Sequence, residues 1–134
     1  MNQEIKKKWL NALRSGDYKQ GRDVLRRVGR DGEDRWCCLG VLCDIIDKKG
    51  WDKTPSTNST NTTAPTYLYK TGIGRQYHEA ECSVPESVAK LAGIDNVFVD
   101  CENGDRTVRA HLESMNDVKK YSFKKIADWI EENL

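Results

Sequence analysis

The chain has 134 residues, 37% of them apolar and 32% charged, which suits one domain that buries a core without disulfides or metal ions as staples. There is no apolar run of signal-peptide length at the amino terminus and no stretch near the roughly 18 apolar residues of a membrane span, so we expect a cytosolic protein with no membrane partner. The net charge of +1 is uneven: residues 1–30 hold nine Lys or Arg and three Asp or Glu, whereas residues 31–134 hold thirteen and eighteen. The excess of positive charge in residues 1–30 is compatible with a solvated helix face or with a surface for an anion such as a nucleotide.

The first predicted helix begins near Gln3 and ends at Gly16. Ile5, Trp9 and Leu13 recur at helical spacing and therefore share one face, and glycine is the natural left-handed residue past a last helical turn. The segment that follows is less regular. Its composition predicts a turn at 18–21, a short strand at 24–28 and a second turn at 29–32.

Residues 36–49 form a strongly apolar segment, and its length and charged flank favour a helix over a strand. Gly40 costs such a helix about 1 kcal/mol relative to Ala, so its presence predicts close approach by another backbone or an aromatic ring. Because this helix is apolar nearly all round, we expect it to be central and buried. The side chains expected to pack on it come from the two terminal helices: Trp9, Leu13, Phe123, Ile126 and Ile130.

Five cysteines are an odd number for a disulfide framework, and in a reducing cytosol we expect thiols. Cys37 and Cys38 are adjacent, and Cys43 lies five residues beyond Cys38, so these spacings make no chelating pair. The other cysteines and the two histidines could join a metal site only through the fold: His78, Cys82, Cys101 and His111. The sequence therefore predicts structural thiols, and neither a metal ion nor a cofactor.

The second half of the chain opens with a low-complexity segment near 53–66, which consists mainly of Thr, Ser, Asn and Pro and predicts a surface loop. Ser83 followed by Pro85 predicts a helix start. The residues expected on its apolar face and at its end are Val88, Leu91, Ala92 and Gly93.

Short strands are expected at 67–69 and 97–99, and turns at 72–74 and 103–104. Residues 106–115 are compatible with either a strand or a short helix. Ser122 predicts the cap of a carboxyl-terminal helix with clear apolar spacing. The expected fold is therefore one α+β domain over 1–134, with about four helices starting near Gln3, Trp36, Ser83 and Ser122 around the central helix, and a few short strands.

Three stretches together resemble a family of small proteins of unknown function encoded by tailed bacteriophages and prophages. They are Trp-Leu-Asn-Ala-Leu-Arg-Ser-Gly-Asp-Tyr-Lys-Gln at 9–20, Cys-Cys-Leu-Gly-Val-Leu-Cys-Asp at 37–44, and Asn-Asp at 116–117 followed by Ser-Phe-Lys-Lys-Ile-Ala-Asp-Trp-Ile-Glu at 122–131. The resemblance covers about half of the chain. It implies an accessory phage gene, and genes of that kind often counter host defence or redirect host metabolism.

The candidate binding residues concentrate before the central helix. Arginine forks bind phosphate, aromatic faces stack on bases, and amides read base edges. The residues selected on this basis are Arg14, Tyr18, Lys19, Gln20, Arg22, Arg26 and Trp36, together with Asn116 and Asp117. The alternative is a scaffold role, in which Arg14 and Gln20 tie the loop to Asp44 or Asp117.

The leading hypothesis is a non-enzymatic phage protein that binds a small anionic ligand, specifically a nucleotide immune signal, in the cytoplasm of the bacterial host. A homo-oligomer is compatible with this hypothesis. Duplex nucleic acid is disfavoured, because the pI is about 7.6 and no DNA-binding motif is present. One alternative is an interaction module that inhibits a host enzyme. Another is a small hydrolase that acts through Asp117 or through Cys37, whose place at a helix start could lower its pKa, with His78 or His111 as base.

Overall fold

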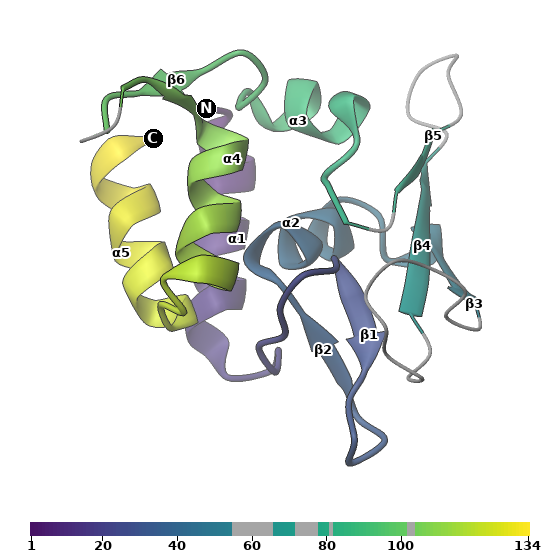
Figure 1. Cartoon of the computed structure of the whole chain (residues 1–134). Helices are drawn as coiled ribbons and strands as arrows, with labels where there is room; N and C mark the ends of the chain where they lie inside the picture. Colours follow the sequence, from purple (N-terminus) through teal and green to yellow (C-terminus); the bar gives the residue numbers. More distant parts are fainter. Residues whose placement is uncertain (55–65, 72–77, 81, 102–103) are drawn as a thin grey trace.

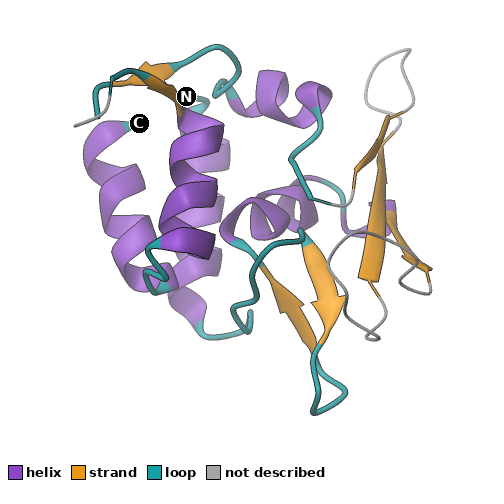
Figure 2. Cartoon of the chain, viewed as in Figure 1, coloured by secondary structure: helices purple, strands orange, loops and turns teal. Residues whose placement is uncertain are grey.

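The computed structural model describes residues 1–54, 66–71, 78–80, 82–101 and 104–134. Within them the α-helices are α1 (Gln3–Ser15), α2 (Cys38–Ile46), α3 (Glu86–Ala92), α4 (Val108–Glu113) and α5 (Phe123–Asn133), with a 3-10 turn at Lys48–Gly50 and a π-helical turn at Ser114–Val118. The strands are β1 (Arg26–Val28), β2 (Asp34–Trp36), β3 (Trp51–Thr54), β4 (Thr66–Thr71), β5 (His78–Ala80), β6 (Phe98–Val99) and β7 (Arg106–Thr107). The predicted α+β class is confirmed, with five helices in place of about four (Figures 1 and 2).

Three of the helices and the strands of the larger sheet occupy different sides of the molecule. Figure 1 shows α1, α4 and α5 on one side, the strands β1 to β5 on the other, and α2 between them. The larger sheet is antiparallel in the order β2-β1-β4-β3, with β5 pairing with β4, and β6 and β7 form a separate pair. The register places Arg26 opposite Trp36, and Trp51 opposite Tyr69.

The predicted central helix is confirmed as buried, but it is shorter than residues 36–49. All residues from Cys38 to Asp44 are buried. Trp36 belongs instead to β2, and Cys37 is the helix cap, where its sulfur accepts a hydrogen bond from the Gly40 amide at 3.3 Å. The backbone of Trp36 pairs with the 19–21 segment, through bonds from the Trp36 amide to the Lys19 carbonyl at 2.9 Å and from the Gly21 amide to the Trp36 carbonyl at 2.7 Å. This pairing keeps Trp36 extended.

The predicted reason for Gly40 is also confirmed. A β-carbon on Gly40 would lie 1.8 Å from the carbonyl oxygen of Leu25. All five side chains expected around α2 are buried, and the Trp9 indole donates to the Cys38 carbonyl at 3.0 Å. Of the two terminal helices, α1 packs against both α2 and α5.

Several element boundaries differ from the prediction. Ser83 does not cap α3. Pro85 disfavours the helical conformation of the residue before it, Val84, and the helix begins only after Pro85. Leu91 is 45% exposed, while Ala89 is buried in the core. The predicted loop at 53–66 is a strand at both ends, since Lys53 and Thr54 lie in β3 and Thr66 in β4.

Other predictions for the second half of the chain concern residues 106–115, the end of α3 and the start of α5. Residues 106–115, which the sequence left open, contain both β7 and α4. Gly93 ends α3 in the left-handed region, and the Ser122 hydroxyl caps α5 by accepting from the Lys125 amide. Residues 55–65, the turn at 72–74 and Asn103 lie outside the described residues.

Candidate functional site

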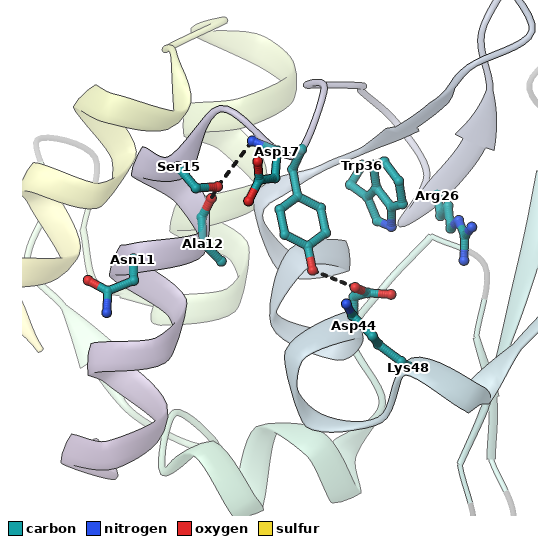
Figure 3. A pocket seen from close by; sticks show the side chains of 9 residues that line it. Asn11, Ala12, Ser15, Asp17, Arg26, Trp36, Asp44 and Lys48 are labelled. Carbon is teal, nitrogen blue, oxygen red and sulfur yellow. Dashed lines mark hydrogen bonds between the residues drawn. The ribbon is translucent and has the colours of Figure 1, made fainter.

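A cleft of about 600 Å³ opens between the end of α1, the hairpin β1–β2 and the end of α2. Its lining residues are Asn11, Ala12, Ser15, Asp17, Tyr18, Arg26, Trp36, Asp44 and Lys48 (Figure 3). We call it the aromatic cleft. Three of the residues selected from the sequence meet here: Tyr18, Arg26 and Trp36.

Tyr18 and Trp36 are brought together by the backbone pairing between the 19–21 segment and β2. Their rings meet edge to face, with centroids 5.1 Å apart and planes at 83°. The Tyr18 hydroxyl donates to Oδ2 of Asp44 at 2.5 Å, and the Trp51 indole donates to Oδ1 at 2.9 Å. Burial, followed by the contact with Asp44, raises the pKa of Tyr18, so the phenol stays protonated and remains a donor. Both oxygens of this nearly buried carboxylate are thus occupied by fixed donors.

Arg26 lies among aromatic rings. Its guanidinium carbon is 4.0 Å from the ring centroid of Tyr67, 4.9 Å from that of Trp36 and 5.4 Å from that of Trp51. The guanidinium also donates to Asp34 at 2.5 Å. Cation–π contact and a carboxylate partner together hold this side chain against the cleft wall.

Two donors in this wall find no acceptor among the described residues. They are Nε of Arg26 and Nε1 of Trp36, both buried. A buried N–H without an acceptor costs about 1–3 kcal/mol. An acceptor oxygen that reached these atoms would remove that cost.

Part of the predicted positive charge is paired with carboxylates within the fold. Lys19 forms ion pairs with Asp31 and Glu33, and Arg26 forms one with Asp34. The charged residues that line the cleft balance, since Arg26 and Lys48 face Asp17 and Asp44. The charge excess seen in the sequence therefore does not translate into a strongly basic cleft.

Arg14 lies apart from the residues that line the aromatic cleft. Its guanidinium pairs with Asp128 at 2.8 Å and with Glu131 at 2.7 Å, both on α5. The scaffold alternative for Arg14 thus has structural support, although its partners are neither Asp44 nor Asp117.

Arg14→Ala is expected to lower the melting temperature slightly, because exposed ion pairs contribute little. The loss should shrink as sodium chloride is added, since salt screens exposed charges. Melting curves of both proteins at low and high salt measure this. An equal loss at all salt concentrations would show that packing of the Arg14 side chain, and not its charge, matters.

Gln20 and Asn116 meet in the interior. Asn116 is fully buried, and its oxygen accepts from Nε2 of Gln20 at 2.9 Å and from the Cys38 amide at 3.3 Å. Its nitrogen donates to the Gly21 carbonyl at 2.9 Å and to Oδ1 of Asp117 at 2.6 Å. This buried amide cluster joins three segments of the chain, so these residues position the cleft without lining it.

Of the remaining selected residues, Arg22 is half-buried and its Nε finds no acceptor among the described residues. It does not line the aromatic cleft.

The environment of Cys37 does not favour its use as a nucleophile. Its side chain is only 5% exposed, and burial raises the pKa of the thiol to about 12, the opposite of the expected lowering by the helix dipole. Burial likewise raises the pKa of Cys38 and Cys43. In the described part of the chain, no three metal-ligating side chains gather into a group, and no helix there is long and apolar enough to cross a membrane.

Sequence reasoning missed part of the cleft. Asp44, Lys48 and Trp51 were not selected as binding residues. An acidic residue inside an otherwise apolar helix was the available signal for Asp44, because a buried carboxylate needs partners. No local signal links Trp51 to Arg26, since sheet pairing brings them together.

A family described as a domain of unknown function (DUF8296) matches the chain over residues 1–134, so the chain belongs to this family. No curated protein and no solved structure matches it.

Proposed function

We propose that this member of the DUF8296 family binds a small nucleotide-like ligand in the aromatic cleft and sequesters it without chemical change. The observation that carries the proposal is a pair of buried donors, Nε of Arg26 and Nε1 of Trp36, for which the described part of the chain offers no acceptor, in a wall built of aromatic rings. Together they offer hydrogen bonds to an oxygen and flat faces to a base.

The size and charge of the cleft narrow the class of ligand. A volume of about 600 Å³ lies within the usual range for small-molecule sites. Tyr18 and Trp36 offer surfaces on which a base can stack. Because Asp17 and Asp44 balance Arg26 and Lys48 in the lining, the cleft favours a ligand with one or two phosphates over a highly charged one.

The biological part of the proposal rests on the resemblance to phage proteins. A phage protein that holds a nucleotide signal in the cytoplasm of the bacterial host would blunt the defence that depends on it. Sequestration requires binding alone, and the buried, protonated thiol of Cys37 supports a role without nucleophilic chemistry at that residue.

The direct experiment is a melting-temperature screen with nucleoside monophosphates, cyclic dinucleotides and ADP-ribose derivatives, followed by calorimetry on those that stabilise the protein. Binding to the native state raises the melting temperature by mass action. Chromatography of the ligand after heat denaturation should recover it unaltered. A flat screen contradicts nucleotide binding, an altered ligand indicates a hydrolase, and capture of one host protein without any nucleotide effect favours an interaction module.

Substitutions at two neighbouring lysines test whether the ligand binds in the aromatic cleft. Lys48 and Lys49 are both exposed, but only Lys48 lines the aromatic cleft. We expect Lys48→Ala to weaken binding roughly tenfold, because one charge-assisted hydrogen bond is worth about 1.5 kcal/mol. Lys49→Ala should bind as the unaltered protein does, and equal calorimetric affinities for the two variants would place the ligand elsewhere.

A further inference from the structure

Cys101 and His111 form a pair outside the aromatic cleft. Cys101 lies between β6 and β7, and His111 lies on α4, the helix that follows β7 directly. Sγ of Cys101 is 3.2 Å from Nδ1 of His111, and both residues are half-buried. The thiol therefore keeps partial access to solvent next to a group that can accept its proton.

The imidazole is held in place on its other side. The His111 ring is stacked at a tilt on Trp129 of α5, with centroids 4.7 Å apart and planes at 38°. Burial, together with the charges of Lys119 and Arg106, lowers the pKa of His111. At pH 7 the ring is accordingly neutral, and with the proton on Nε2 the Nδ1 lone pair faces the thiol.

The other thiols of the chain provide the comparison. Cys37, Cys38 and Cys43 are buried in α2 or at its cap, and burial raises their pKa values. Buried thiols of this kind are inert. Cys82 is exposed and serves as a solvent-accessible reference within the same molecule.

We propose that Cys101 is a modification site that exchanges with low-molecular-weight disulfides, with His111 as the base. The Cys101 thiol gives its proton to Nδ1 of His111 as its sulfur attacks one sulfur of the small disulfide. The sulfur–sulfur bond of the reagent breaks, and the leaving thiolate takes the proton back from His111 and departs as a thiol. Cys101 is oxidised to a mixed disulfide, and half of the reagent is reduced to thiol.

The test uses the full chain and oxidised glutathione as the disulfide. Peptide mass spectrometry over a time course reports the rate of glutathione addition at Cys101 and at Cys82 in one sample. We expect Cys101 to react faster than Cys82. His111→Asn keeps a hydrogen-bond acceptor near the sulfur but cannot take up a proton, and it should slow Cys101 roughly tenfold at pH 7, because an unassisted thiol is only a few per cent thiolate there.

The rate at Cys82 should stay unchanged in the His111→Asn variant, which separates loss of the base from general loosening of the fold. A Cys101 that reacts no faster than Cys82 in the unaltered protein overturns the proposal without any variant. An unchanged Cys101 rate in a folded His111→Asn protein, checked by circular dichroism, overturns the role of His111. Neither result depends on nucleotide binding in the cleft.

Discussion

Replacement of Gly40 by alanine is expected to destabilise the protein by at least about 3 kcal/mol, although alanine is favoured over glycine inside a helix by about 1 kcal/mol. The new β-carbon would lie 1.8 Å from the carbonyl oxygen and 2.7 Å from the carbonyl carbon of Leu25. Both atoms are backbone, so no side chain can rotate away. Moving Leu25 would also strain the 3.1 Å bond from the Cys37 amide to its carbonyl, next to the start of α2.

Gly32→Ala provides the matched control. Gly32 has a φ of +79°, and a β-carbon there would meet nothing within 4 Å. Its cost is that of a left-handed alanine, about 1 kcal/mol. Midpoints of denaturant unfolding compare the two variants. If Gly40→Ala proves as stable as Gly32→Ala, α2 and the Leu25 backbone do not approach each other as closely as the structure has them.

The case of Gly40 also shows what the sequence could predict. A glycine inside an apolar helix is a local irregularity with a local cost, and it indicates a close neighbour even when that neighbour is unknown. The identity of the neighbour, Leu25, depends on how the loop before β1 crosses α2. The same distinction explains why periodicity predicts α1, α2 and α5 well but misplaces the start of α2, since Trp36 is held extended by backbone bonds to residues 19–21.

For the candidate site as well, the sequence predicts the chemistry of the side chains but not their partners in the fold. Tyr18, Arg26 and Trp36 were selected for their chemistry, and all three line the aromatic cleft. Arg14 was selected by the same argument, yet its carboxylate partners on α5 lie more than a hundred positions further along the chain. Residue type predicts what a side chain can bind, whereas the guanidinium of Arg14 is already bound by two carboxylates of α5. Such partners are set by helix packing, which local sequence patterns do not contain.

Asn116 is the strongest example of a residue whose chemistry was recognised and whose role was not. Asparagine was expected to contact a ligand, but every polar atom of this side chain is already satisfied within the protein. The amide joins Gln20 and Gly21, which precede β1, to the first residue of α2. It thereby fixes the loop that carries Tyr18 and pairs with Trp36, so the aromatic cleft depends on it.

Asn116→Ala is accordingly expected to lower the free energy of unfolding by about 3 kcal/mol, because it strands buried polar groups that cost about 1–3 kcal/mol each. The groups left without this partner include the Cys38 amide and the Gly21 carbonyl. Asn133→Ala is the control, since Asn133 is exposed and its side chain donates to the Trp129 carbonyl one helical turn away. Denaturant unfolding should separate the two variants clearly. Equal stabilities would mean that water replaces Asn116 without cost, and the cluster would then not hold the cleft in place.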